Sequence, residues 1–333
     1  MTWVLGIDGG NTKTLAAVAD GGGVTHGTGR GACADIYNAP TPAIGLDAIE
    51  AAAGEALARA GIVAAQIDAA TFSLAGADWP EDFALFERSL RERLGLPAPP
   101  QIVNDALGAL RGGSPDWTGI SIVSGTYNAV GARHPDGRVF HLGFWPDGAG
   151  SRHLARAGLR AVYNHALGIA PPTVLTERAL ALFGASDAFD LLHRFTRRGG
   201  LPEAESDRLT PVLLDAADEG DAVAREIVAE TGAVLGRQGR ACADQVDLPL
   251  PGARVVLSGG VFGHPTLRLA DATLAELPGA IAVRRPAPPI AGALLLALDR
   301  LGIDVDAATV AAGLSFPVPE GRIAPWAASP SRA

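Results

Sequence analysis

The feature that most constrains the fold is a strand pattern that occurs twice. Residues 3–30 contain three short apolar segments separated by turn residues, and residues 119–142 repeat this arrangement. Each set of three is followed by segments with helical spacing of apolar residues. Three such strands form an antiparallel meander, and alternation with helices is typical of α/β proteins. The repeat therefore predicts two related α/β domains, not a solenoid or a propeller.

A chain of 333 residues exceeds one small domain, which agrees with this division. We predict domains at 1–115 and 116–315 and a tail at 316–333, with the apolar helix 288–301 able to pack back on the first domain. Predicted strands are 3–8, 13–20, 24–30, 69–75, 101–104, 119–124, 129–133, 138–142 and 254–257. Predicted helices are 45–60, 80–94, 150–167, 177–183, 207–219, 222–246, 265–277 and 288–301.

Charge and cysteine content restrict the partners. The net charge of −9 would repel a nucleic-acid backbone. The two cysteines, Cys33 and Cys242, have no spacing that indicates a disulfide framework, a zinc site or an iron–sulfur cluster. The N-terminus does not read as a signal peptide, and the apolar run 290–298 is far shorter than the roughly 20 residues that span a bilayer. We expect a soluble cytoplasmic protein without nucleic-acid or membrane partners.

The first turn of the first meander has the composition of a phosphate site. Gly9 and Gly10 leave the backbone bare, so that amide groups can approach a ligand. Thr12 adds a hydroxyl group, and Asp8 at the end of the strand could hold a metal ion through water. The alternative is a tight hairpin that uses glycine only for its turn. The segment is not a Walker loop, because no Gly-Lys-Ser/Thr opens a helix.

The second meander has an equivalent turn, Ser124-Gly125-Thr126. Alone it favours an ordinary hairpin, but two equivalent turns from two domains could clamp one phosphate chain. Between them, Asn104-Asp105 ends a strand and opens a helix. Asp105 suits a helix cap, or a general base that accepts the proton of a sugar hydroxyl.

Two further segments could contact a ligand. The strand 254–257 leads into Ser258-Gly259-Gly260, where a flat adenosine could lie on bare backbone, or where strand and helix merely pack closely. The loop from Trp145 to Ser151 combines an aromatic residue and a carboxylate, which is common in sugar sites and in ordinary loops. Gly27-x-Gly29-x-Gly31 has the wrong spacing for a dinucleotide fingerprint, and no helix follows it.

In this order, the motifs resemble those of the actin, hexokinase and heat-shock-chaperone ATPase superfamily. In detail they resemble its N-acetylglucosamine kinase branch, the BadF/BadG/BcrA/BcrD ATPase group, over residues 4 to about 300. The resemblance implies two RNase H-like (actin-like ATPase) domains around a central nucleotide cleft, ATP and Mg²⁺ as cofactors, and a homodimer. It also implies a kinase that phosphorylates the 6-hydroxyl of an amino sugar, with Asp105 as base, Asp8 near Mg²⁺ and N-acetylglucosamine as the first candidate.

The resemblance assigns roles by motif. The residues expected at the nucleotide are Asp8, Gly9, Gly10, Asn11, Thr12, Lys13, Gly125, Thr126, Ser258, Gly259 and Gly260. The residues expected at the sugar are Asp35, Asn104, Asp105, Tyr127, Asn128, Trp145, Asp147, Gly150 and Ser151.

Departures from the family pattern lie mainly on the sugar side. Tyr127-Asn128 replaces the usual Gly-Ser, and Asp35 stands where the family commonly has Asn. Asp147 is displaced by one residue, and Ala149 replaces an acidic residue. An ionised carboxylate at position 35 can accept hydrogen bonds or pair with an ammonium group. Glucosamine, another hexose and N-acetylmuramic acid therefore remain alternative substrates, as do an ATPase of the BadF type and a sugar sensor that transfers no phosphate.

Overall fold

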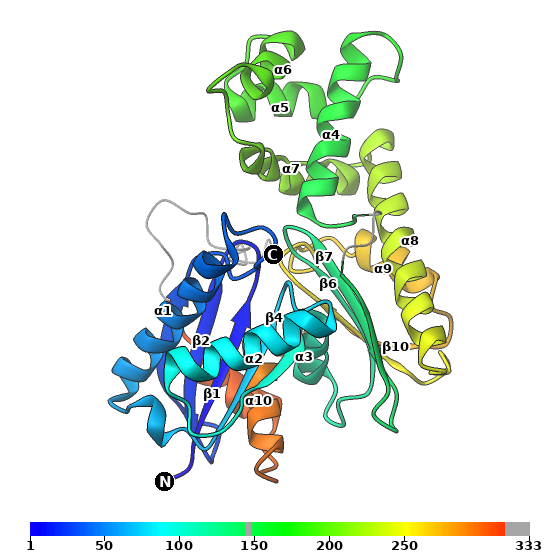
Figure 1. Ribbon diagram of the computed structural model, residues 1–333. Helices are drawn as coiled ribbons and strands as arrows, with labels where there is room; N and C mark the ends of the chain where they lie inside the picture. Colours follow the sequence, from blue (N-terminus) through cyan, green and yellow to red (C-terminus); the bar gives the residue numbers. More distant parts are fainter. Residues whose placement is uncertain (144–147, 317–333) are drawn as a thin grey trace.

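The computed structural model describes residues 1–143 and 148–316, which form two five-stranded sheets (Figure 1). In the first sheet the strand order is β3-β2-β1-β4-β5. Strands β1 to β3 are antiparallel, whereas β4 and β5 run parallel to β1. Their bounds are β1 Trp3–Gly9, β2 Thr14–Asp20, β3 Thr25–Gly31, β4 Ala69–Leu74 and β5 Gln101–Asn104.

The second sheet repeats this topology with the order β10-β9-β6-β7-β8. Strands β6 to β8 form the meander, and β9 and β10 add in parallel. Their bounds are β6 Gly119–Ser124, β7 Asn128–Arg133, β8 Val139–Leu142, β9 Arg254–Ser258 and β10 Ile281–Val283. The predicted fold class, two related α/β halves, is confirmed.

The helices cover the sheets, except for a group that stands apart. Helices α4 to α7 form a separate helical layer beyond the edge of the second sheet (Figure 1). The helices are α1 Pro42–Ala60, α2 Pro80–Leu94, α3 Asp105–Gly113, α4 Ser151–Ala166, α5 Leu175–Phe183, α6 Ala188–Thr196, α7 Leu209–Glu219, α8 Ala222–Gln245, α9 Arg268–Ala275, α10 Pro289–Asp299 and α11 Ala307–Ala312. Two short 3₁₀ helices span Ala64–Gln66 and Glu203–Arg208.

Most of the predicted elements are present, and the differences have local causes. Helix α1 begins three residues before the predicted start at Gly45, because the Thr41 side chain accepts a hydrogen bond from the Ile44 amide and Pro42 fits the first turn. Strand β10 was not predicted, since it has three residues and lies at a sheet edge with Ile281 exposed. Helix α6 was not predicted either, and Asp187 caps its start. The tail after Phe316 lies outside the described residues.

The glycines of β3 serve packing. A Cβ atom at Gly27, Gly29 or Gly31 would lie 2.0–2.1 Å from a backbone oxygen of α1. Bare backbone on this strand therefore lets the helix lie directly on the sheet. This close approach explains the Gly-x-Gly-x-Gly pattern without a dinucleotide.

Helix α3 lies between the two halves and contacts strands of both sheets (Figure 1). On one side a Cβ at Gly108 would lie 2.0 Å from Ser73 Oγ of β4. On the other side a Cβ at Gly113 would lie 2.7 Å from the side chain of Val256 in β9. Helix α10 then packs on α3, where a Cβ at Gly292 would lie 2.1 Å from the Gly108 carbonyl oxygen. α10 also contacts β1 and β4 of the first sheet.

This packing predicts opposite effects for two helical glycines. Gly292→Ala should lower the free energy of unfolding by about 1–3 kcal/mol, because its methyl group would overlap the α3 backbone. Gly54→Ala is the matched control: position 54 is exposed on α1 and nothing lies within 4 Å of a Cβ there. That change should stabilise the protein by about 0.5–1 kcal/mol. Urea unfolding measures both, and equal effects at the two sites would contradict the packing.

Candidate active site

The first meander turn joins β1 to β2 and is closely held. The Gly10 amide donates to the Lys13 carbonyl at 3.0 Å, and the Ala34 amide donates to the Gly10 carbonyl at 3.1 Å. A Cβ at Gly9 would lie 2.6 Å from Leu74 and 2.8 Å from Ala34. Glycine at position 9 is therefore required for the turn to lie against β4 and the loop after β3.

The second turn, between β6 and β7, is fastened to the loop ahead of α4. The Ser151 amide donates to Gly125 O at 2.8 Å, and the Arg152 amide donates to Thr126 O at 3.0 Å. A Cβ at Gly150 would lie 2.6 Å from the Thr126 oxygen, so only glycine permits this contact. Gly150 and Ser151 therefore fix the turn by backbone contacts. Tyr127 is 43% exposed, with the Arg152 guanidinium 5.8 Å from its ring centre.

The two turns meet across the boundary between the halves. Thr12 Oγ1 and Thr126 Oγ1 lie 2.7 Å apart, within hydrogen-bond distance, although the residues are 114 positions apart in the chain. Two hydroxyl groups and two glycine-rich backbones thus face one small space. This juxtaposition is what a clamp on one phosphate chain requires.

The segment that follows β9 packs against the start of the second turn. Gly259 follows β9 with φ +94°, and a Cβ there would lie 2.4 Å from the Ser124 oxygen. The Val261 amide donates to that same oxygen at 3.0 Å. Ser258 is buried, whereas Gly260 is exposed. The Ser258–Gly260 segment therefore lies beside the start of the second turn.

Two carboxylates lie at the carboxyl ends of the parallel strands β1 and β5, which flank β4 in the first sheet. Asp8 is in register with Ser73 of β4, and Asp105 opens α3 directly after β5. Burial raises the pKa of Asp8 to about 6, against the opposing charge of Lys13. Burial, together with the negative charges of Asp8 and Asp78, raises the pKa of Asp105 to about 7. A carboxyl group with a pKa near 7 is well matched to accept a proton at neutral pH.

A third carboxylate, Asp78, was not predicted from the sequence. The side-chain amide of Asn104 donates to Asp78 Oδ1 at 3.0 Å, and Asn104 Oδ1 accepts from the Ala106 amide at 3.1 Å. Asn104 therefore caps α3 and aligns Asp78 with it. Burial and the charges of Asp35 and Asp82 raise the pKa of Asp78 to about 6. Its position soon after β4 was a signal, since Asp8 and Asp105 also stand at strand ends.

Asp35 and Asn128 are more strongly engaged by their own surroundings. Asp35 is 5% exposed, and it accepts from the Tyr37 amide at 2.9 Å and from the Asn38 side chain at 2.8 Å. The Asn128 side chain donates to Gln238 at 2.8 Å and accepts from the Ala149 amide at 2.8 Å. Asp35 therefore holds its own loop near Asp78, and Asn128 connects α8 to the residue two positions before α4. Trp145 and Asp147 lie outside the described residues.

The first turn carries side-chain oxygens that could face a Mg²⁺ ion bound to phosphates. Asn11 Oδ1, in the first turn, is buried and has no partner in the part of the chain described. An oxygen acceptor of this kind and the Asp8 carboxylate suit the water shell of Mg²⁺, which usually keeps several waters. No three His, Cys, Asp or Glu side chains among residues 1–143 and 148–316 are grouped to ligate a metal directly. The residues therefore fit an ion that is held mainly by the phosphates.

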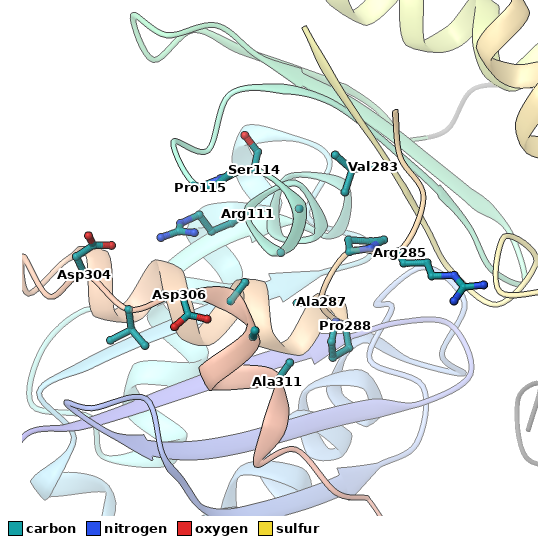
Figure 2. A pocket seen from close by; sticks show the side chains of 16 residues that line it. Arg111, Ser114, Pro115, Val283, Arg285, Ala287, Pro288, Asp304, Asp306 and Ala311 are labelled. Atoms are coloured by element: carbon teal, nitrogen blue, oxygen red, sulfur yellow. The ribbon is translucent and has the colours of Figure 1, made fainter. Parts of the chain in front are cut away.

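A cavity of about 660 Å³ lies elsewhere, between the end of α3, the segment leading into α10 and helix α11 (Figure 2). Arg111 and Arg285 line it together with Asp304 and Asp306. None of the residues predicted at the nucleotide or the sugar is among its lining.

Among the described residues, no helix is long and apolar enough to cross a membrane.

The raised pKa of Asp105 predicts a stability change. Its folded pKa of about 7 exceeds the ordinary 3.8, so ionisation opposes folding as the pH rises from about 4 to above 7. Asp105→Asn should raise the melting temperature by about 2 °C or more at pH 8 and have little effect below pH 4.

Asp116→Asn is the control with the opposite sign. Burial raises the Asp116 pKa, but hydrogen bonds from Ser114 and Thr118 and the charge of Arg254 lower it more. This replacement should lower the melting temperature at pH 8, with the effect lost as the pH falls through the depressed pKa. A lower melting temperature for Asp105→Asn at pH 8 would contradict the inference that the ionised Asp105 carboxylate destabilises the folded protein.

Comparisons with known proteins agree with this geometry. The chain belongs to the BadF/BadG/BcrA/BcrD ATPase family, which matches residues 5–297. It is 26% identical over 274 residues to an N-acetylmuramic acid/N-acetylglucosamine kinase of Clostridium acetobutylicum, covering 79% of this chain and 87% of that protein.

Solved structures show the same fold. A protein described as a candidate N-acetylglucosamine kinase from Porphyromonas gingivalis superposes with a TM-score of 0.66 at 18% identity, covering 90% of this chain and 100% of the other. A ROK family glucokinase from Streptomyces griseus, in complex with glucose and AMPPNP, superposes with a TM-score of 0.56 at 21% identity, covering 89% and 99%. The actin-like ATPase fold expected from the sequence is thus confirmed.

Proposed function

We propose that this member of the BadF/BadG/BcrA/BcrD ATPase family is an ATP-dependent kinase that phosphorylates an amino sugar at its 6-hydroxyl. The observation that carries the proposal is that Asp105 lies close to Asp8, at the start of the first of two turns whose threonine hydroxyls face each other. N-acetylglucosamine is the leading substrate, because relatives in sequence and in structure carry that activity in their names. A kinase that uses ATP fits a cytoplasmic location, and the homodimer remains a prediction.

The reaction follows from the positions of these groups. The Asp105 carboxylate accepts the proton of the sugar hydroxyl, whose oxygen forms a bond to the γ-phosphorus of ATP. The bond from that phosphorus to the β–γ bridging oxygen breaks, and ADP leaves with the electron pair. Mg²⁺, when bound, neutralises charge on the phosphates. Thr12, Thr126 and the amides of the two turns hold the phosphate chain in line with the hydroxyl.

Chemistry at phosphorus depends here on alignment and charge more than on covalent help from the protein. The Ser258–Gly260 segment is proposed to support the adenosine, and Lys13 to add positive charge beside Asp8. The sugar then lies on the side of Asn104, Asp105 and Tyr127. In this proposed arrangement, Asp105 lies between ATP and the sugar.

Removing the base tests the proposal. Asp105→Ala should lower kcat by about 10²- to 10⁴-fold with the best sugar, while the KM for Mg²⁺-ATP changes little. ADP release is measured with N-acetylglucosamine, glucosamine, N-acetylmannosamine, N-acetylmuramic acid and glucose. The matched control is Asp244→Asn, at an exposed position of α8, which should retain full activity.

Turnover near that of the wild type for Asp105→Ala would exclude its role as base. ADP release that no sugar stimulates would instead favour an ATPase or a sensor.

A further inference from the structure

Asp78 stands where the two halves of the molecule meet on the sugar side. It follows β4 in the first half, and a Cβ at Gly143, just after β8 of the second half, would lie 2.3 Å from its Oδ1. Bare backbone at Gly143 therefore lets the second half close directly over the carboxylate. Beside this contact, the ring centres of Phe83 in α2 and His141 in β8 are 6.2 Å apart.

The carboxylate of Asp78 is held in place rather than free to turn away. Asn104 donates to its Oδ1, and Asn104 is itself fixed by the cap of α3. Asp105 directly follows Asn104 in the chain, and the charge of Asp78 raises the pKa of Asp105, so the two carboxylates lie close together. A sugar whose hydroxyl reaches Asp105 has its remaining substituents close to Asp78.

The electrostatic surroundings of Asp78 are negative. The charges of Asp35 and Asp82 raise its pKa, and its own charge acts on Asp105. Asp82 caps α2 by accepting from the amides of Asp78 and Trp79, and the Tyr37 hydroxyl also donates to it. Asp35 has both oxygens engaged by its own loop. Asp78 Oδ2, in contrast, has no hydrogen-bond partner within residues 1–143 and 148–316.

We infer that Asp78 selects the sugar by charge: it favours an amino sugar with a free ammonium group and disfavours one that carries a carboxylate. In a partly buried site, a charge of opposite sign is attracted more strongly than in water, and a like charge is repelled. Relative to neutral N-acetylglucosamine, the charge of Asp78 then raises kcat/KM for glucosamine. It lowers kcat/KM for N-acetylmuramic acid. This inference deepens the proposed kinase function and depends on it.

Three sugars and two variants test this selection. The specificity constant kcat/KM is measured for glucosamine, N-acetylglucosamine and N-acetylmuramic acid, and each value is expressed relative to N-acetylglucosamine. Asp78→Asn keeps an oxygen for the Asn104 hydrogen bond and removes the charge. Glu81→Gln removes a charge of the same sign from an exposed position three residues away, in the first turn of α2, and should leave the ratios unchanged.

In Asp78→Asn, the glucosamine ratio should fall at least tenfold and the N-acetylmuramic acid ratio should rise at least threefold. A folding defect would lower all three rates together, whereas a lost charge moves the two ratios in opposite directions. The changes should fall mainly on KM. Ratios within twofold of the wild type would overturn the inference while the kinase function stands.

Affinity measurements separate this inference from the function on which it rests. If none of the three sugars is phosphorylated, the kinase proposal fails, and their dissociation constants are compared by isothermal titration calorimetry. Opposite shifts of glucosamine and N-acetylmuramic acid binding in Asp78→Asn would still support charge selection. Equal shifts, or no binding of any of the three, would reject it.

Discussion

The structure depends on the close packing of α3 between the two sheets. Gly108 and Gly113 bring the helix backbone against β4 and β9, and Gly292 brings α10 against α3. Interiors are packed as densely as organic crystals, so these contacts leave little freedom in the distance between the halves. The same helix begins with Asp105. The element that sets the spacing of the halves therefore also places the proposed base between them.

A further consequence is a concentration of negative charge at the strand ends. Asp8, Asp78 and Asp105 all have a raised pKa because burial disfavours their ionised forms, and neighbouring carboxylates add repulsion at Asp78 and Asp105. Such strain costs stability in the free protein, and it is common at sites where proton transfer needs a group poised near neutral pH. Positive charge from Lys13 lowers the pKa of Asp8, and a bound Mg²⁺ ion or ammonium group would offset more of the negative charge. In the proposed function, substrate binding and charge balance are therefore linked.

Much of this arrangement could be predicted from the sequence, because turns and strand ends have strong local signals. The two meanders and the facing turns follow from glycine placement and the repeat. Asp78 was missed, since its role arises from Asn104 and Gly143, and contacts between distant segments leave no local pattern. Strand β10 was missed because three edge residues carry too little periodicity. For Asp35 and Asn128, the sequence could not show how fully their own loops engage them.

The central claim is that the turns at Thr12 and Thr126 grip one phosphate chain. A double-mutant cycle tests it: the affinity for Mg²⁺ with a non-hydrolysable ATP analogue is measured by calorimetry for Thr12→Val, Thr126→Val and the double variant. Because the two hydroxyl groups also contact each other, the same cycle is measured with adenosine, which lacks phosphates. If both groups act on the same phosphates, the losses for the ATP analogue should be non-additive, with a coupling energy about 0.5–3 kcal/mol larger than that for adenosine. A coupling energy within about 0.3 kcal/mol of the adenosine value would mean that the turns act independently on the phosphates, which would contradict the clamp.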